Sequence, residues 1–335
     1  MKRNGIIAIV ILLIFAAGCS SVNPAGVADT PQNSPTAAGL TTVRLPVGYI
    51  PNVQFAPLYV AIENGYYRDE GLDVHIDYSM ENDNAVLLGS NNIQFAILSG
   101  EQVLLGRGQQ LPLVYVMDWY QQYPVGVTSK VSANITKPAD LKGKRIGLPG
   151  TYGASYIGLI ALLDSAGLTE NDVTLDSIGF NQVAALSTDR DDAVVIYVAN
   201  EPNVLKSEGI DVNVIKVSDY SSLVGNGLVT NETTLANNPD LVQKMVRATL
   251  KGIAYVNANP DQSFQICMKY VENLANSDQA LQKQVLADSI AEWQAATPGE
   301  SDPAAWENMQ RILLKMSLLT APLDLNQAYT NQFVP

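Results

Sequence analysis

The stretch MDWYQQYPVGV, residues 117–127, brings together three large aromatic side chains, Trp119, Tyr120 and Tyr123, in a chain that is only 7% aromatic. Rings of this kind can hold a flat ligand by stacking on its faces, which is worth about 1–3 kcal/mol per ring. The same residues could instead pack beneath a loop, and we expect this for at least one of them. Because an apolar, strand-like run at 112–118 precedes them, their position at a strand end favours a clamp for a flat molecule.

Polar and aromatic residues also follow the first expected strand, in the segment GYIPNVQFAPLY, which supplies Tyr49, Asn52, Gln54 and Phe55. Ligands of doubly wound α/β folds bind at the carboxyl ends of strands, where helix N-termini present free backbone N–H groups. A binding role is therefore predicted for these residues. Asn52 is equally well explained as a helix N-cap, and Phe55 as a core residue.

Polar and aromatic residues also follow two other expected strands. The turn GTYGAS follows residues 144–150 and offers the ring of Tyr152, but it lacks the Gly-Lys-Ser/Thr ending of a phosphate-binding loop. A tight strand-to-helix turn would also need its glycines. The turn IYVANEP supplies Tyr197, Asn200 and Glu201, although a solvated loop has a similar composition. All four residues are candidate ligand contacts.

The segment ILSGEQ places Ser99 at another expected strand end, with Glu101 just inside the helix that follows. Both residue types are favoured there for local reasons, since serine caps helices and an acidic residue in the first turn complements the helix dipole. Ser99 and Glu101 are therefore candidate ligand contacts, with helix capping and a favourable position in the helix dipole as the alternative explanation.

Residues suited to catalysis are sparse. His75 is the only histidine and lies in the middle of an expected strand, and Cys267 lies in the helical pattern FQICMKYVENL, where a buried structural thiol is expected. A Ser-His-Asp or Cys-His arrangement would have to use one of these two residues. No cluster has the spacing of metal ligands. The sequence thus predicts a protein that is not an enzyme and has neither metal nor cofactor.

Strand-like apolar runs alternate with helical patterns along most of the chain. The strand-like runs are residues 43–49, 72–78, 92–98, 112–118, 144–150 and 191–198. This alternation is typical of an α/β fold with a parallel sheet. From about residue 235 to residue 319 the pattern is helical, so we expect two α/β units and a helical C-terminal part.

The N-terminal segment MKRNGIIAIVILLIFAAGC has a basic start, an apolar run too short to span a bilayer, and small residues before its cysteine. Residues 1–18 are therefore predicted to be a signal peptide. FAAGC resembles a bacterial lipobox, so Cys19 is expected to carry lipid such as palmitate, although a plain secretory signal would look similar. Residues 19–42 are rich in Ser, Thr, Pro, Ala and Gly and are predicted to form a tether.

The net charge of −13 excludes a general electrostatic attraction to nucleic acid or to anionic lipid. The membrane is therefore expected to be a partner only through the lipid anchor. The length beyond the tether is sufficient for one large or two ordinary domains.

Three segments carry a family resemblance: PLYVAIENGYYRDEGLDV, ADLKGKRIG and LVTNETTLANNPDLVQKMVRATLKGIAYVNANP. Together they resemble the NMT1/THI5-like family of ABC-importer substrate-binding proteins, over about residues 43–260. The resemblance implies a type II periplasmic-binding-protein fold, in which two α/β lobes are joined by two crossovers and ligand is held between them. It also implies that lobe 1 comprises 43–127 and 226–335, and lobe 2 comprises 128–225.

Family members that bind the thiamin pyrimidine precursor typically show Asp-Trp-x-Pro-Asn-x-x-His at the first strand end. Here Pro51 and Asn52 match, whereas Gly48, Tyr49 and Phe55 replace the Asp, Trp and His. The departure favours a larger flat ring, and the chain is similar to the riboflavin-binding lipoproteins of RibXY-type importers. The implied function is capture of riboflavin at the outer face of the cell membrane and delivery to an ABC permease and its ATPase.

Three other functions fit the resemblance. The ligand could be the hydroxymethylpyrimidine (HMP) or formylaminopyrimidine precursor of thiamin. A pyrimidine-synthase-like enzyme would need a pocket histidine and a lysine bearing pyridoxal phosphate, and no pocket histidine is expected here. The third is a receptor for sulfonates or for another small solute on the same fold. A sulfonate receptor would need Arg or Lys at the strand ends, and none is found there.

Overall fold

The computed structural model describes residues 39–335. The predicted signal peptide 1–18, the predicted lipidation site Cys19 and most of the predicted tether lie outside the described residues. The first strand begins at Thr41, whose backbone N donates to Gly71 O at 2.9 Å, so regular structure starts slightly before residue 43. Within residues 39–335, no helix combines the length and the apolar character needed to cross a bilayer.

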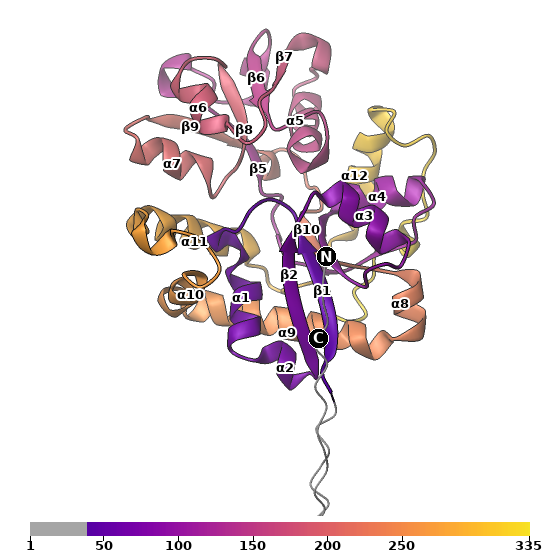
Figure 1. Cartoon of the computed structure of the whole chain (residues 1–335). Coiled ribbons are helices and arrows are strands. Elements are labelled where there is room, and N and C mark those ends of the chain that lie inside the picture. Colours follow the sequence, from indigo (N-terminus) through magenta and orange to yellow (C-terminus); the bar gives the residue numbers. More distant parts are fainter. Residues whose placement is uncertain (1–38) are drawn as a thin grey trace, which may run out of the picture. The chain divides into compact units, whose positions relative to one another are not determined.

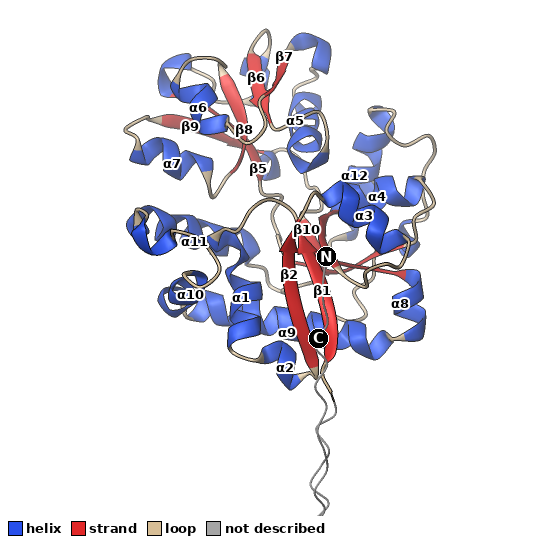
Figure 2. Cartoon of the chain, viewed as in Figure 1, coloured by secondary structure: helices blue, strands red, loops and turns tan. Residues whose placement is uncertain are grey.

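Ten described strands form three sheets (Figure 2). The strands are β1 (Thr41–Val47), β2 (Leu72–Tyr78), β3 (Ala96–Ser99), β4 (Leu113–Asp118), β5 (Val125–Lys130), β6 (Arg145–Leu148), β7 (Thr174–Ser177), β8 (Ala193–Tyr197), β9 (Val212–Lys216) and β10 (Asn226–Asn231). Their orders are β1-β2, β3-β10-β4 and β7-β6-β8-β5-β9.

One sheet is parallel, one is antiparallel and the five-stranded sheet is mixed, which corrects the expectation of a parallel sheet. β1 pairs with β2 and β6 with β7 and β8 in parallel, whereas β10 runs antiparallel to β3 and β4, and β5 antiparallel to β8 and β9. The reason is that β5 and β10 are the strands by which the chain enters a new sheet. A short buried strand has the same apolar pattern in either direction, so periodicity did not reveal this.

Helices surround these sheets: α1 (Ala56–Glu63), α2 (Tyr66–Asp69), α3 (Glu81–Gly89), α4 (Gly100–Gly108), α5 (Gly153–Ser165), α6 (Gln182–Ser187), α7 (Glu201–Ser207), α8 (Glu232–Asn237), α9 (Pro239–Ala258), α10 (Pro260–Cys267), α11 (Gln279–Trp293), α12 (Pro303–Lys315) and α13 (Leu325–Ala328). The longest, α9, packs its apolar face on α1. Their approach depends on Gly252, where an added Cβ would lie 2.3 Å from Pro57 O.

Two lobes result from this arrangement (Figure 1). The five-stranded sheet, β5 to β9, lies with α5, α6 and α7 in one lobe, and the other two sheets lie with most of the remaining helices in the other. The predicted boundaries, 43–127 with 226–335 for lobe 1 and 128–225 for lobe 2, remain predictions.

The two connections between the lobes touch each other. Trp119 N and Tyr120 N both approach Asn226 O, at 3.2 and 3.0 Å. Beside this contact, Gly225 packs so closely that an added Cβ would lie 2.7 Å from Tyr120 O. The outgoing and returning chains are therefore joined at one point, which we call the crossover contact (Trp119, Tyr120, Gly225 and Asn226).

Candidate functional site

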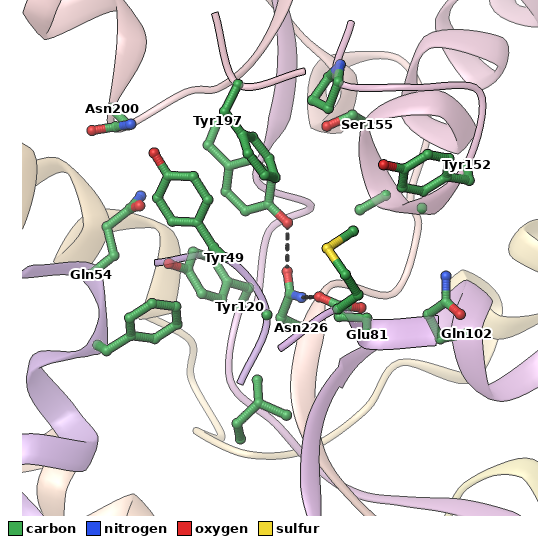
Figure 3. Close-up of a pocket in the computed structure, with 18 of the residues that line it drawn as sticks. Tyr49, Gln54, Glu81, Gln102, Tyr120, Tyr152, Ser155, Tyr197, Asn200 and Asn226 are labelled. Atoms are coloured by element: carbon green, nitrogen blue, oxygen red, sulfur yellow. Dashed lines mark hydrogen bonds between the residues drawn. The ribbon is translucent and has the colours of Figure 1, made fainter. Parts of the chain in front are cut away.

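A cavity opens between the lobes and takes side chains from both (Figure 3). Its volume is about 1050 Å³, open solvent at its mouth included. The lining combines aromatic rings, neutral amides, two carboxyl groups and small residues: Gly48, Tyr49, Gln54, Phe55, Met80, Glu81, Asn82, Ile97, Gln102, Trp119, Tyr120, Pro149, Tyr152, Gly153, Ala154, Ser155, Phe180, Gln182, Tyr197, Asn200, Glu201 and Asn226. Such a mixture suits a partly aromatic ligand with a polar edge.

Most of the residues predicted from the sequence meet in this lining: Tyr49, Gln54, Phe55, Trp119, Tyr120, Tyr152, Tyr197, Asn200 and Glu201. They come from the carboxyl ends of β1, β4, β6 and β8 and the segments that follow, which are far apart in the chain. The carboxyl ends of these strands therefore face the gap between the lobes, as the rule for open α/β sheets predicts. The roles of these residues in binding remain predictions.

Four predicted residues lie outside the lining: Asn52, Ser99, Glu101 and Tyr123. Asn52 caps the 3-10 helix η1 (Val53–Phe55), and its Oδ1 accepts a hydrogen bond from Gln54 N at 3.0 Å. Tyr123 is buried in the core, where its hydroxyl donates to Ala154 O at 2.9 Å. Local capping and packing account for the positions of both side chains.

A chain of hydrogen bonds runs from the cavity floor into lobe 1 (Figure 3). Tyr197 Oη donates to Asn226 Oδ1 at 3.1 Å, and Asn226 Nδ2 donates to Glu81 Oε1 at 2.9 Å. Glu81 Oε2 accepts from Ser99 N at 3.0 Å and from Ser99 Oγ at 2.7 Å. Behind it, Ser99 Oγ also contacts Glu101 Oε1. Ser99 and Glu101 thus lie beneath the floor and hold Glu81 in place.

The two carboxyl groups of this chain cannot both be ionised. Ser99 Oγ has one proton but two carboxyl neighbours, so one carboxyl must donate to it. Glu81 accepts several hydrogen bonds, whereas Glu101 Oε2 has no partner among the described residues. Burial, with the charge of Glu81, raises the pKa of Glu101 to about 8. We infer that Glu101 holds the proton and Glu81 the charge at neutral pH.

The aromatic residues divide between core and cavity mouth. Trp119 is 1% exposed, and its ring centroid lies 5.7 Å from that of Trp293, so it packs in the core while lining the cavity. Tyr152, at 48% exposure, and Phe180, at 54%, are far more open. Tyr49 reaches from lobe 1 to place its ring edge-on to Phe180 at 5.1 Å, with its backbone in the left-handed region at φ 75°.

Two buried N–H donors of the lining lack an acceptor within residues 39–335. They are Gln54 Nε2, on a side chain that is 5% exposed, and Trp119 Nε1. Unpaired buried donors cost free energy, so they mark places where a ligand acceptor would be stabilising. On the opposite wall, Glu201 Oε2 accepts from Tyr197 N at 2.9 Å, and burial raises the pKa of Glu201 to about 7.

Several lining residues were not predicted from the sequence, including Glu81, Phe180, Gln182 and Asn226. Glu81 begins α3, which closely follows β2. The rule that ligands bind at the carboxyl ends of strands, which we call the strand-end rule, could therefore have predicted it. Phe180 and Gln182 follow β7, and Asn226 begins β10, two strands that were not recognised. Their omission is therefore a consequence of missing those strands.

The residues considered for catalysis lie elsewhere. His75 is on β2, with its side chain 63% exposed and 2.9 Å from Asp73 Oδ2. Cys267 is buried at the end of α10, and burial raises the pKa of its thiol to about 12. Neither lines the cavity. In the described part of the chain, no cluster of three or more His, Cys, Asp or Glu residues could hold a metal ion.

Comparison with known proteins gives related sequences over nearly the whole chain. Residues 52–263 match the family model described as NMT1/THI5 like. The riboflavin-binding protein RibY of Chloroflexus aurantiacus is 39% identical over 97% of this chain and 96% of its own. The formylaminopyrimidine-binding protein of Halalkalibacterium halodurans is 29% identical over 99% of both chains.

Solved structures share the fold. The alkanesulfonate-binding protein SsuA from Xanthomonas axonopodis pv. citri, bound to MOPS, superposes with a TM-score of 0.69, covering 88% of this chain and 100% of that chain. Its sequence identity is 15%, so the likeness concerns the fold alone. The predicted periplasmic-binding-protein fold, with two α/β lobes and a cavity between them, is confirmed.

Proposed function

The chain belongs to the NMT1/THI5-like family, and from this membership we propose that it is an extracytoplasmic solute-binding protein of an ABC importer with riboflavin as its ligand. In this role the protein captures the vitamin between its lobes and presents it to a permease driven by an ATPase. Ligand favours the closed arrangement of the lobes because only that arrangement brings both walls into contact with it. The relative named for riboflavin binding supports the choice of ligand.

The observation that carries the proposal is the pair of unpaired donors in the lining. Gln54 Nε2 and Trp119 Nε1 need acceptors, and an isoalloxazine ring carries carbonyl and ring-nitrogen acceptors on one edge. The exposed rings of Tyr152 and Phe180 can contact its faces. Neutral amides, among them Asn200, can bond the hydroxyl groups of the ribityl chain.

The expected affinity follows from ligand size. A ligand of about 27 heavy atoms at about −0.3 kcal/mol per atom gains about −8 kcal/mol, which corresponds to a Kd near 1 μM. Titrating riboflavin into the purified protein, with flavin fluorescence and calorimetric heat as readouts, tests this. Saturable binding at one site with a Kd of about 1 μM or below is expected. Absence of both quenching and heat would refute riboflavin as the ligand.

A second candidate ligand is the formylaminopyrimidine precursor of thiamin, favoured by the 29% identical relative. The same titration with that compound distinguishes the two, because the aromatic lining favours the larger ring. We propose a binding protein rather than a pyrimidine synthase, since the histidine that such an enzyme would need is on the exposed face of β2. Anchoring through lipid on Cys19 at the outer face of the cell membrane completes the proposed role.

A further inference from the structure

The charged side chains of the cavity lining are all acidic. Glu81 lies at the floor and Glu201 on the opposite wall, and no lysine, arginine or histidine lines the cavity within the described chain. Many other carboxylates of the protein are in ion pairs, such as Glu70 with Arg247 and Asp164 with Arg311. Between residues 39 and 335, no ion pair includes Glu81 or Glu201. Their negative charge therefore acts on whatever enters the cavity.

Burial raises the pKa of Glu81, and hydrogen bonds to its carboxylate oppose this rise. Three of them, from Ser99 and Asn226, reach its two oxygens, and we place the proton of the buried pair on Glu101. A carboxylate that accepts several hydrogen bonds is stabilised in its ionised form. The floor of the cavity thus places a negative charge beside the ligand.

Glu201 adds a second negative charge on the lobe-2 wall. It is 8% exposed and accepts a hydrogen bond from Tyr197 N, which orients the carboxyl group. Burial raises the pKa of Glu201 to about 7, so the group is mostly ionised at pH 8.

The helix end at the cavity best suited to an anion is the N-terminus of α5, where Tyr152 provides no side-chain cap and Gly153, Ala154 and Ser155 line the cavity. The first turn of α5 holds no acidic residue, unlike those of α3 and α7, which begin with Glu81 and Glu201. A helix N-terminus is equivalent to about half a positive charge. A phosphate monoester carries about −1.5 to −2 at neutral pH. The N-terminus of α5 can therefore bind a neutral hydroxyl or carbonyl oxygen. Its partial positive charge does not offset the repulsion between a phosphate and two carboxylates.

We propose that the cavity selects the uncharged form of its ligand and that Glu81 and Glu201 are specificity-determining residues that reject phosphorylated forms. This inference rests on the proposed function and deepens it: riboflavin is accepted, and riboflavin 5′-phosphate, which has the same ring and chain, is excluded. A phosphate with a charge of about −2 and a carboxylate about 12 Å away, at an effective dielectric constant of about 40, repel each other enough to weaken binding about tenfold. Two carboxylates thus give about 100-fold discrimination.

The test compares the two flavins on the purified protein at pH 8 by calorimetry. Riboflavin is expected to bind about 100-fold more tightly than its 5′-phosphate. Riboflavin binding accompanied by equal or tighter binding of the phosphate would overturn the inference alone and point to α5 as a phosphate site. Failure of riboflavin to bind, whether or not the phosphate binds, would refute the proposed function and this inference with it.

A variant that removes one carboxylate tests whether the preference for riboflavin over its 5′-phosphate arises in the cavity. Glu201→Gln keeps an oxygen that can accept from Tyr197 N, and it should reduce the preference for riboflavin over its phosphate from about 100-fold to about tenfold. The matched control is Glu272→Gln, which makes the same change in net charge at an exposed residue outside the lining. The control should keep the parent preference. Equal preferences in the two variants would contradict a local role for Glu201.

Discussion

Gln54→Leu should stabilise the ligand-free protein and weaken ligand binding. The side chain is 5% exposed, and its Nε2 has no acceptor within the described residues. Leucine has a similar volume and no polar atom, so it fills the same space without a buried unpaired donor. One substitution therefore shifts stability and affinity in opposite directions, which a purely structural role for Gln54 would not produce.

The size of each effect follows from the cost of an unpaired polar group. Such a group costs about 1–3 kcal/mol when buried, so its removal should raise the free energy of unfolding by about 1–2 kcal/mol after repacking. In the complex, the variant loses a hydrogen bond and leaves a ligand acceptor unpaired. The Kd for riboflavin should rise about 5- to 30-fold.

Urea denaturation of the ligand-free protein and calorimetric titration with riboflavin measure the two quantities. The control is Gln243→Leu, because Gln243 Nε2 donates to Phe333 O at 2.8 Å and lies outside the cavity lining. The control should be less stable by about 1 kcal/mol, with an unchanged Kd. A Gln54→Leu protein that is less stable than its parent, or that binds riboflavin equally well, would refute the reasoning.

Trp119→Ala should lower the free energy of unfolding by about 3–5 kcal/mol, because Trp119 is 1% exposed and packs on Trp293. It should also weaken riboflavin binding. An unchanged urea midpoint would contradict the place of Trp119 in the core. Glu101→Gln should reduce the pH dependence of stability. The pKa of Glu101 rises from 4.5 to about 8 on folding, so its contribution is full below about pH 4.5 and is lost as pH rises through about 8. Urea midpoints from pH 5 to 9 should therefore decline less steeply in the variant than in the parent, and parallel curves would show that Glu101 ionises normally.

Apolar runs located β1, β2, β3, β4, β6 and β8. β2 spans the predicted residues 72–78, and β4 and β8 fall within their predicted runs. Four strands were missed: β5 and β10, which are almost wholly buried, and β7 and β9, which are partly exposed. β7 pairs with β6, and β5 pairs with β8 and β9, and such contacts between distant residues are not revealed by local pattern.

The strand-end rule found much of the candidate site, but it did not distinguish binding residues from supporting ones. Ser99 and Tyr197 are both polar residues at strand ends, yet Ser99 faces inward to Glu81 and Tyr197 faces the cavity. Tyr120 and Tyr123 belong to one aromatic cluster, but only Tyr120 lines the cavity. Residue type and spacing are the same for both uses, and the direction of each side chain is decided by tertiary packing.

The crossover contact has a mechanical consequence. Because Asn226 O receives Trp119 N and Tyr120 N, and Gly225 leaves no room for a side chain, the outgoing and returning chains share one fulcrum. Rotation of one lobe about a fulcrum displaces atoms in proportion to their distance from it. Asn226 belongs to both the fulcrum and the cavity floor. A small rotation of one lobe about this point would therefore leave the floor nearly stationary while it separates the rings of Tyr49 and Phe180, which lie farther from it.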